Sequence, residues 1–182
     1  LFKSMEGAEE LGHLFQFNVE ALAESGLIKP EDLLGKPASV ALNLPGGTKR
    51  QFHGLVCAAG TEAASGKMFR YRLILRPWLW LLTRRTDTRV FQDMSVQDIL
   101  KKVVDAFSPD YEFKLKGKFP KYEYCVQYRE SDFNFVSRLM EQEGIYYFFR
   151  HEVGKHTMMI VDSSSFQQPY PSHEKFEFRG SV

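Results

Sequence analysis

The amino-acid sequence predicts an α+β chain that is mostly β, with a small antiparallel β-barrel followed by an α+β region. Three observations support this prediction. Phe and Tyr are frequent, with 16 and 8 copies in 182 residues, and aromatic residues favour strands. Apolar and polar residues alternate over about residues 10–90, with glycine-rich turns between the alternating runs. Further along, the apolar spacing changes to that of helices. We therefore expect two domains, residues 1–92 and 93–182.

The first half reads as consecutive antiparallel strands. Residues 13–22, HLFQFNVEAL, alternate strictly, which is typical of a half-buried strand. ASVALNL and KRQFHGLVCAA flank the turn PGG at 45–47, where glycine can supply positive φ angles. A longer loop, GTEAASG at 60–66, leads to FRYRLILRP, whose aromatic and leucine side chains share one face. This order of short strands and turns indicates a small barrel or a strongly curled sheet.

The second half is predicted to contain two helices and a hairpin. Residues 95–107, SVQDILKKVVDAF, have apolar side chains at helical spacing. Ser95 and Asp98 resemble a capping box in which Asp replaces the usual Glu or Gln. Another helix is expected over 131–143, between a serine cap and a glycine at its end. IYYFFRHE and KHTMMIVD then form a hairpin around Gly154.

The bulk composition argues against several classes of function. The formal net charge is +1, so no global field draws the chain to nucleic acid or an anionic membrane. No apolar run approaches the roughly 18 residues of a membrane span, so stable membrane insertion is not expected. The start of the sequence lacks the apolar core of a secretory signal. Cys57 and Cys125 form no CxxC motif, and we expect two buried thiols instead of a disulfide.

The motifs that would carry chemistry are incomplete. HEVGKH at 151–156 separates its histidines by five positions instead of the four of zinc proteases, which favours a turn with two surface histidines. GTEAASGKM at 60–68 has one spacer too many for a phosphate loop and lacks its hydroxyl. No G-x-S-x-G elbow is present. The sequence predicts no catalytic residue, no cofactor and no metal. The alternative is a hydrolase with a dispersed Ser/His/carboxylate site.

The segment 67–89 is strongly basic. Asp87 is its single acid, against Lys67, Arg70, Arg72, Arg76, Arg84, Arg85 and Arg89. Such a patch suits phosphate backbones, but aromatic residues that would stack on bases do not share its face. We therefore expect no nucleic-acid partner, and interpret the segment as the polar face of a sheet or as a charged surface that meets a protein partner.

The second predicted helix has acidic residues at its carboxyl end. There the helix dipole disfavours each of Glu141 and Glu143 by about 0.3–1 kcal/mol. Arg138 is placed to offset Glu141 three residues further on. The remaining acidity is either solvated surface or awaits a cation from a partner.

Two segments interpreted as β, IYYFF at 145–149 and PWLWLLT at 77–83, are apolar on both faces. At about 2 kcal/mol per large side chain, burying the first segment represents on the order of 10 kcal/mol. One face of each can enter the domain core, and the other needs a second layer from elsewhere in the chain or from another subunit. We predict an assembly interface whose candidate residues are Trp78, Trp80, Leu82, Tyr146, Phe148, Arg84 and Arg85.

Five stretches together resemble the amino-terminal region of the valine–glycine-repeat protein G (VgrG) family, from about Leu11 to Asp162. They are LGHLFQFNVEAL, LLGKPASVAL, FHGLV, YRLILRPWLWLLTRRTDTRVFQDMSVQDIL and YCVQYRESDFNFVSRLMEQEGIYYFFRHE. Members of this family are trimeric spike proteins of the bacterial type VI secretion system. The resemblance implies a phage-tail-hub-like fold in which the second domain, 93–182, is incomplete.

The same resemblance implies a structural function without enzymatic activity in this region. The expected assembly is a homotrimer that forms a pseudo-sixfold ring, caps the tube of haemolysin-coregulated protein and carries the puncturing spike. Other spike or baseplate components and effectors are further implied partners. The expected route is assembly in the bacterial cytoplasm followed by secretion or delivery into a target cell, without a signal peptide.

Overall fold

The computed structural model describes residues 1–24, 26–44, 47–63, 68–107 and 110–167. The strands are β1 (Phe2–Ala8), β2 (Gln16–Ala23), β3 (Pro37–Asn43), β4 (Lys49–Ala63), β5 (Phe69–Arg76), β6 (Thr86–Phe91), β7 (Met94–Ser95), β8 (Tyr111–Lys114), β9 (Lys121–Tyr122), β10 (Cys125–Ser131), β11 (Tyr146–Glu152) and β12 (Lys155–Val161). The helices are α1 (Pro30–Leu33), α2 (Val96–Val104) and α3 (Asp132–Gln142), with 3-10 turns η1 (Trp78–Arg84), η2 (Asp105–Phe107) and η3 (Ser164–Phe166).

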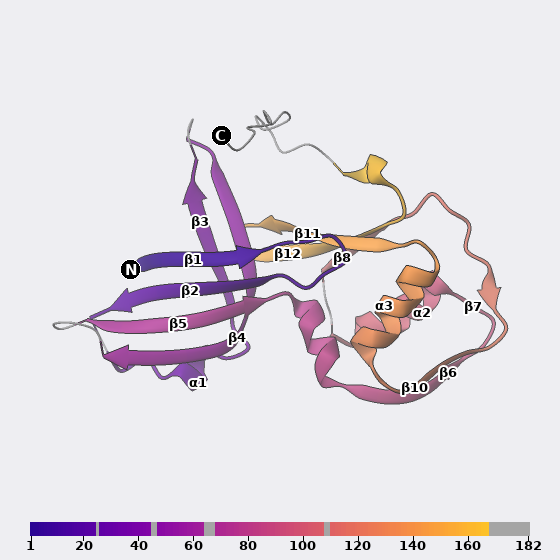
Figure 1. Ribbon diagram of the computed structural model, residues 1–182, viewed down its shortest axis with the longest axis horizontal. Helices are drawn as coiled ribbons and strands as arrows, with labels where there is room; N and C mark the ends of the chain where they lie inside the picture. The colour runs from indigo at the N-terminus through magenta and orange to yellow at the C-terminus, as the bar shows by residue number, and fades with distance from the viewer. Residues whose placement is uncertain (25, 45–46, 64–67, 108–109, 168–182) are drawn as a thin grey trace, which may run out of the picture.

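The first half forms one curled antiparallel sheet with the strand order β1-β2-β5-β4-β3, shown in indigo to magenta in Figure 1. Its concave core contains Phe15, Phe17, Val19, Phe52, Val56 and Leu75. A register shift between Val56 and Ala58 places a bulge in β4, which increases the local twist of the sheet. The sheet is a half-barrel, because β1 and β3 are its edges and do not pair with each other in the described residues.

The second half packs α2 and α3 between two smaller β units (Figure 1). β6 and β10 form an antiparallel ribbon, while β11 and β12 form a hairpin that β8 extends in parallel. The larger core includes Val96, Ile99, Leu100 and Val103 from α2 and Phe135, Val136, Leu139 and Met140 from α3. The predicted fold class is confirmed: an α+β chain, mostly β, with a curled antiparallel sheet.

The helix and hairpin predictions are confirmed closely. α2 continues into η2 and so reaches Phe107, and α3 begins after the Ser131 cap. Gly144 follows α3 at φ 68°, a conformation that glycine adopts without strain. The β11–β12 hairpin turns at Gly154, which has φ 75°. The predicted PGG turn lies partly outside the described residues. In the loop predicted at 60–66, residues 60–63 are instead part of β4, and 64–66 lie outside the described residues.

PWLWLLT is not a strand, as the sequence analysis assumed, but the 3-10 turn η1, which begins after Pro77. Its roughly threefold period turns Trp78, Leu79 and Leu82 inward, where they pack with residues of α2 and α3. Residues 78–91, placed in the first domain by the sequence analysis, thus contribute to the second core. The division into two domains stays a prediction. Phe149 packs against both cores.

The capping box at α2 is complete in the structure. Ser95 Oγ accepts a hydrogen bond from the Asp98 backbone N–H at 3.2 Å, and the Ser95 N–H donates to Asp98 Oδ2 at 3.2 Å. The Ser95 hydroxyl, which donates to Asp98 Oδ2 at 2.6 Å, and the Ser95 backbone N–H hold the pKa of the Asp98 carboxyl below its usual value. We expect Ser95→Ala to lower the free energy of unfolding by about 1 kcal/mol, measured by urea denaturation. The matched control is Ser4→Ala in exposed β1, expected to change it by less than about 0.5 kcal/mol.

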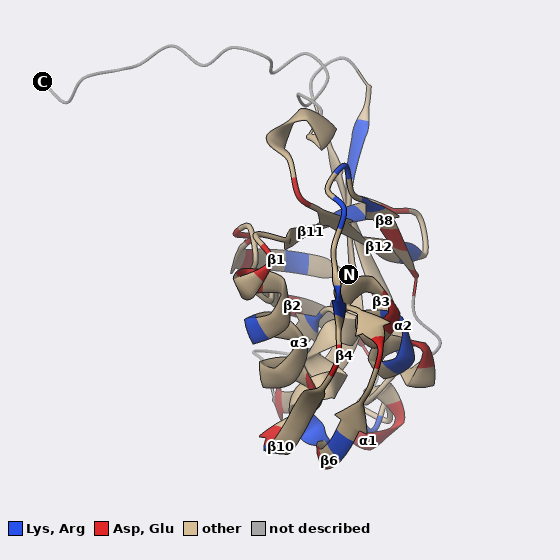
Figure 2. Ribbon diagram, turned by 90° about the vertical axis from the view of Figure 1, so that its right-hand side faces the viewer, with Lys and Arg blue, Asp and Glu red and all other residues tan. Residues whose placement is uncertain are grey.

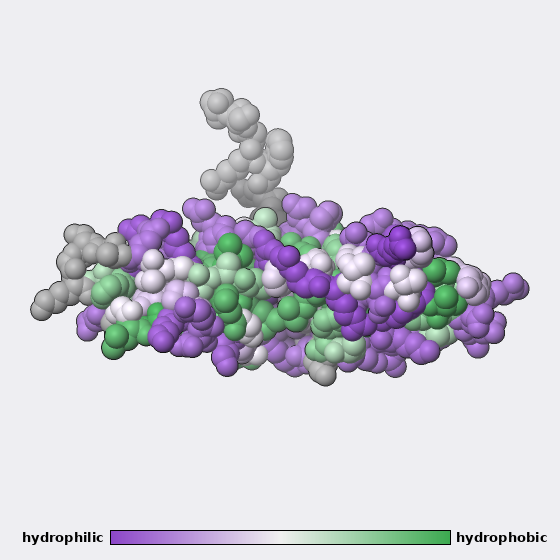
Figure 3. Space-filling model, turned by 90° about the horizontal axis from the view of Figure 1, so that it is seen from below, coloured by the Kyte–Doolittle hydropathy of each residue, from purple (hydrophilic) through white to green (hydrophobic). Residues whose placement is uncertain are grey.

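The described residues contain two free cysteines, of which Cys125 is buried and Cys57 is partly buried. Among these residues, no helix combines the length and apolar character needed to cross a bilayer. On the face seen in Figure 3, apolar side chains form several separate patches among hydrophilic ones.

Candidate assembly surface

The seven predicted interface residues do not lie on one surface. Trp78 is 6% exposed and Leu82 is fully buried in the chain's own core. Of the two sources of cover that the sequence allowed, the chain itself supplies it here, because α2 and α3 pack against Trp78 and Leu82. These two side chains are therefore not available as interface residues. The Trp78 indole N–H also donates to the Asp110 carbonyl, at 3.2 Å. Trp80, Arg84, Arg85, Tyr146 and Phe148 remain candidates by their exposure.

Trp80 lies half-exposed on η1, between the two halves of the chain. The guanidinium carbon of Arg84 lies 4.4 Å from the centre of a Trp80 ring, and that of Arg76 lies 5.3 Å from it. Both distances fall within the range of favourable cation–π contact. The aromatic side chain and the basic segment, considered separately in the sequence, thus form one patch.

Arg85 belongs to a different, largely internal cluster around Asp132. Asp132 is fully buried, and its Oδ1 accepts hydrogen bonds from Arg89 Nη2 and Gln127 Nε2. Its Oδ2 lies 3.1 Å from Arg85 Nε, an ion-pair contact without hydrogen-bond geometry. Gln127 closes the cluster by accepting from Arg89 Nε at 2.9 Å. These charges compensate one another, so Arg85 contributes more to internal structure than to a contact surface.

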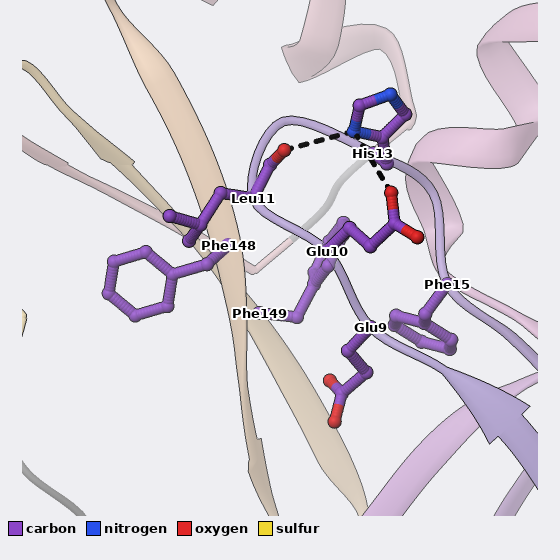
Figure 4. Close-up of a pocket in the computed structure, with 7 residues that line it drawn as sticks. All are labelled: Glu9, Glu10, Leu11, His13, Phe15, Phe148 and Phe149. Atoms are coloured by element: carbon purple, nitrogen blue, oxygen red, sulfur yellow. Dashed lines mark hydrogen bonds and ion pairs between the residues drawn. The ribbon is translucent and has the colours of Figure 1, made fainter. Parts of the chain in front are cut away.

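Tyr146 and Phe148 lie on one face of β11, the edge strand of its sheet, and both are partly exposed. Phe148 lines a pocket of about 210 Å³ with Leu11, Phe15 and Phe149 (Figure 4). Leu11 is 55% exposed, so the apolar patch continues from β11 onto the loop before β2. The opposite face of β11, with Tyr147, is buried in the core. This patch agrees with the prediction that one face of IYYFF lacks cover.

Three histidines meet where the two halves of the chain join. The cross-strand partners His151 and His156 face each other in the β11–β12 hairpin, and His53 arrives from β4. His156 is 3% exposed and the His151 side chain is 7% exposed, so the prediction of two surface histidines at 151 and 156 is wrong. His53 is also buried, at 5% exposure. The sequence did not identify His53 as a member, because its contacts with β12 span 103 positions. Within the described residues, no group of three or more His, Cys, Asp or Glu is arranged to hold a metal ion.

Hydrogen bonds fix where each of these rings carries its proton. The Trp78 backbone N–H donates to His156 Nε2 at 2.9 Å. Neutral His156 therefore carries its proton on Nδ1 and donates a hydrogen bond from it to His53 Nδ1 at 2.7 Å. His53 therefore carries its proton on Nε2, a buried atom without a partner. The His53 backbone N–H donates to His151 Nδ1, so His151 donates from Nε2 to Glu9 Oε1 at 2.8 Å.

Burial and the neighbouring rings oppose protonation in this cluster. Burial lowers the pKa of His156 to about 3, with smaller contributions from His53 and His151. Burial also lowers the pKa of His53, followed by the effect of His151, while Asp110 acts in the opposite direction. A second proton on His156 would lie on Nε2 and point at the Trp78 backbone N–H, which is itself a donor. His53 and His156 are therefore neutral side chains in the core where the two halves join.

The groove between α3 and the loop before β2 brings together the residue types that the alternative, a dispersed hydrolase site, would need. His13 and Ser137 both line this groove, with Glu130 and Glu141. Ser137 Oγ is sealed from solvent and has no hydrogen-bond partner, and His13 instead contacts the Leu11 carbonyl and Glu10. No histidine in the described part of the chain forms a hydrogen bond to a serine. His173 lies outside that part.

The ion pair predicted at the acidic end of α3, between Arg138 and Glu141, does not form. Arg138 pairs with Glu130, through Nη2 at 2.7 Å, instead of offsetting Glu141. Glu143 accepts a hydrogen bond from the Tyr122 hydroxyl. Glu141 forms no ion pair with any described residue and faces the groove. Of the two acids, Glu141 is therefore the one left for solvent or for a cation from elsewhere.

The charges of the basic segment are compensated in part. Arg72 pairs with Glu20 at 3.4 Å and with Glu62 at 2.9 Å. Arg85 and Arg89 pair with Asp132. In the view of Figure 2, Lys and Arg are interspersed with Asp and Glu. That no nucleic acid is bound stays a prediction.

Comparison with known proteins identifies the family. Residues 8–181 match the family model described as phage tail baseplate hub (GPD). The chain belongs to this hub family. Among curated relatives, the type VI secretion system spike proteins VgrG1b and VgrG1c of Pseudomonas aeruginosa are 48% identical over 170 residues and 50% identical over 160 residues. The matches cover 93% and 87% of this chain, and confirm the resemblance to VgrG.

Solved structures show the hub fold directly. The Escherichia coli c3393 protein, described as a type VI secretion component similar to the T4 bacteriophage tail proteins gp27 and gp5, aligns with a TM-score of 0.81 and 28% identity. The alignment covers 90% of this chain and 46% of that one. A Shewanella oneidensis prophage MuSo2 tail protein shares the fold alone, at a TM-score of 0.59 and 15% identity over 79% of this chain and 44% of the other. The chain spans 23% and 22% of the length of the two Pseudomonas relatives.

Proposed function

We propose that this chain serves as the hub part of a type VI secretion spike protein, without catalytic activity of its own. In this role it joins two further copies to form a pseudo-sixfold ring, docks onto the tube of haemolysin-coregulated protein and supports the puncturing spike. Assembly takes place in the bacterial cytoplasm, and the spike is then secreted or delivered into a target cell. The match of residues 8–181 to the hub family carries the proposal.

Two features of the structure support an assembling subunit. The half-barrel sheet has open edges at β1 and β3, and every described residue of β1 except Met5 is exposed. Open strand edges are places where another strand can pair. The patch of Phe148, Tyr146 and Leu11 adds an apolar surface of the kind that subunits cover. We propose Phe148 and Tyr146, together with Trp80, Arg84 and Arg85, as interface residues.

Sedimentation of a full-length spike protein carrying this sequence tests the proposal. We expect a trimer at micromolar concentration. Phe148→Glu should weaken trimerisation by at least about tenfold, because a carboxylate would then be buried in an apolar contact. Tyr128→Glu is the matched control, since Tyr128 is 63% exposed on β10 and lies outside the proposed interface. Circular dichroism would verify that both variants fold.

Two results would contradict this assignment. A wild-type protein that stays monomeric at micromolar concentration would overturn the trimer. A trimer of unchanged stability in Phe148→Glu would remove the β11 patch from the interface while leaving the trimer in place.

A further inference from the structure

Arg76 and Arg84 of the basic segment form no ion pair with any described residue. Arg76 donates from Nε and Nη2 to Gln16 Oε1, at 3.2 and 2.6 Å, and Gln16 is a neutral amide. Arg84 is exposed and forms no hydrogen bond or ion pair with any described residue. Arg85, the next residue, is by contrast paired with Asp132. The positive charges of Arg76 and Arg84 are thus left uncompensated.

Both guanidinium groups converge on the Trp80 side chain. Their central carbons lie 5.3 and 4.4 Å from the centre of a Trp80 ring. The indole N–H of Trp80 is a donor only, and it forms no hydrogen bond within the described part of the chain. Because Arg76 directs two of its five N–H groups at Gln16, its Nη1 donors are available. The patch therefore presents N–H donors from Arg76, Trp80 and Arg84 and contains no carboxylate that would accept from them.

The Cys57 thiol does not supply a negative charge that would balance Arg76 and Arg84. Burial raises the pKa of Cys57, while Arg76 and Arg84 act in the opposite direction with smaller effects. The thiol therefore stays neutral at physiological pH. Among the described residues, no acidic group forms an ion pair with Arg76 or Arg84.

We infer that Arg76, Trp80 and Arg84 bind a carboxylate side chain of a protein partner. The planar guanidinium matches the two oxygens of a carboxylate, and an arginine–carboxylate hydrogen bond is stronger than a neutral one. A nucleic-acid backbone is a poorer match, because it would require a longer row of uncompensated cations than these two arginines. The inference rests on the proposed function only for the existence of a protein neighbour.

The two tryptophans provide the test. In an ¹⁵N spectrum of the 182-residue chain, the two indole N–H signals are assigned with Trp80→Phe. We expect the Trp80 signal to shift in a saturable way with the peptide acetyl-Glu-Glu-Glu-amide, while the Trp78 signal, whose N–H is bound to Asp110, stays in place. Arg84→Gln should weaken the apparent affinity by about fivefold or more. Lys102→Gln, which removes an exposed charge on α2, should leave it unchanged.

Three results would overturn the inference. They are the absence of a Trp80 shift at roughly tens of millimolar peptide, an equal shift with the Gln-Gln-Gln peptide, and an apparent affinity that is unchanged in Arg84→Gln. Inorganic phosphate is a further arm: an equally tight shift would assign a site for free anions and overturn the protein side chain as ligand. The sedimentation experiment is independent, so a trimer without peptide binding would refute this inference alone, and peptide binding without a trimer would refute the proposed function alone.

Discussion

Asp132→Ala is expected to lower the free energy of unfolding by about 3–5 kcal/mol, because it leaves two arginines without their buried counter-charge. Asp132 is fully buried and contacts Arg89, Gln127 and Arg85. It is also the first residue of α3, where a carboxylate is favoured by the helix dipole. Its loss would therefore destabilise the β6–β10 ribbon and the start of α3 together. Urea denaturation followed by circular dichroism measures the effect.

A matched control separates this effect from the loss of any aspartate. Asp32→Ala removes an exposed carboxylate from the first turn of α1 and should change the unfolding free energy by less than about 0.5 kcal/mol. Adding Arg89→Leu to Asp132→Ala should recover part of the loss, since it removes an unpaired charge. A loss below about 1 kcal/mol in Asp132→Ala would show that the cluster contributes little to stability.

Acidification from pH 6.5 to pH 4.5 is expected to remove about 2–3 kcal/mol of stability through His156 alone. The pKa of His156 is lowered from 6.5 to about 3 in the folded chain by burial, so only the unfolded chain takes up a proton in this range. Stability is therefore fully present above pH 6.5 and declines as pH falls towards 3. His53, whose pKa is also lowered, acts in the same direction.

The acids with lowered pKa values do not dominate this range. Hydrogen bonds and nearby cations lower the pKa values of Glu20, Glu112, Asp98 and Asp162, so their contribution is lost mainly below about pH 4.5. Unfolding free energies at pH 7.5, 6.5, 5.5 and 4.5 measure the slope. His156→Phe should flatten it, and His13→Gln, at an exposed histidine, should not. An equal slope in wild type and His156→Phe would contradict the assignment to His156.

The predicted elements that held depend on local patterns. The capping box of Ser95 and Asp98, the Ser131 cap and the turn at Gly154 each involve residues a few positions apart, and the structure contains all three. Strands β2, β3, β4 and β5 of the first sheet likewise follow from period-two alternation, whereas β1 was not predicted. The hub family followed from long stretches of specific sequence, which chemistry motifs alone would not have identified.

The corrected elements depend on contacts between distant residues. PWLWLLT has no period that separates a strand from a 3-10 turn, and its inward side chains are set by α2 and α3. Arg138 had two acids within reach, and the fold of β10 brought Glu130 to it in place of Glu141. His151 and His156 were predicted to be exposed, but they are covered because β4 places His53 against them.

By itself, the sequence determined the fold class and the limits of α2 and α3, because backbone preferences and apolar periods act over a few residues. The family followed from the long stretches of resemblance. Only the tertiary structure decided which apolar side chains stay uncovered and which charges stay unpaired. Trp78 and Trp80 stand two positions apart, yet one completes a core and the other lies beside two arginines without acidic partners. Burial and charge compensation depend on the elements that pack against a residue, and these elements come from far along the chain.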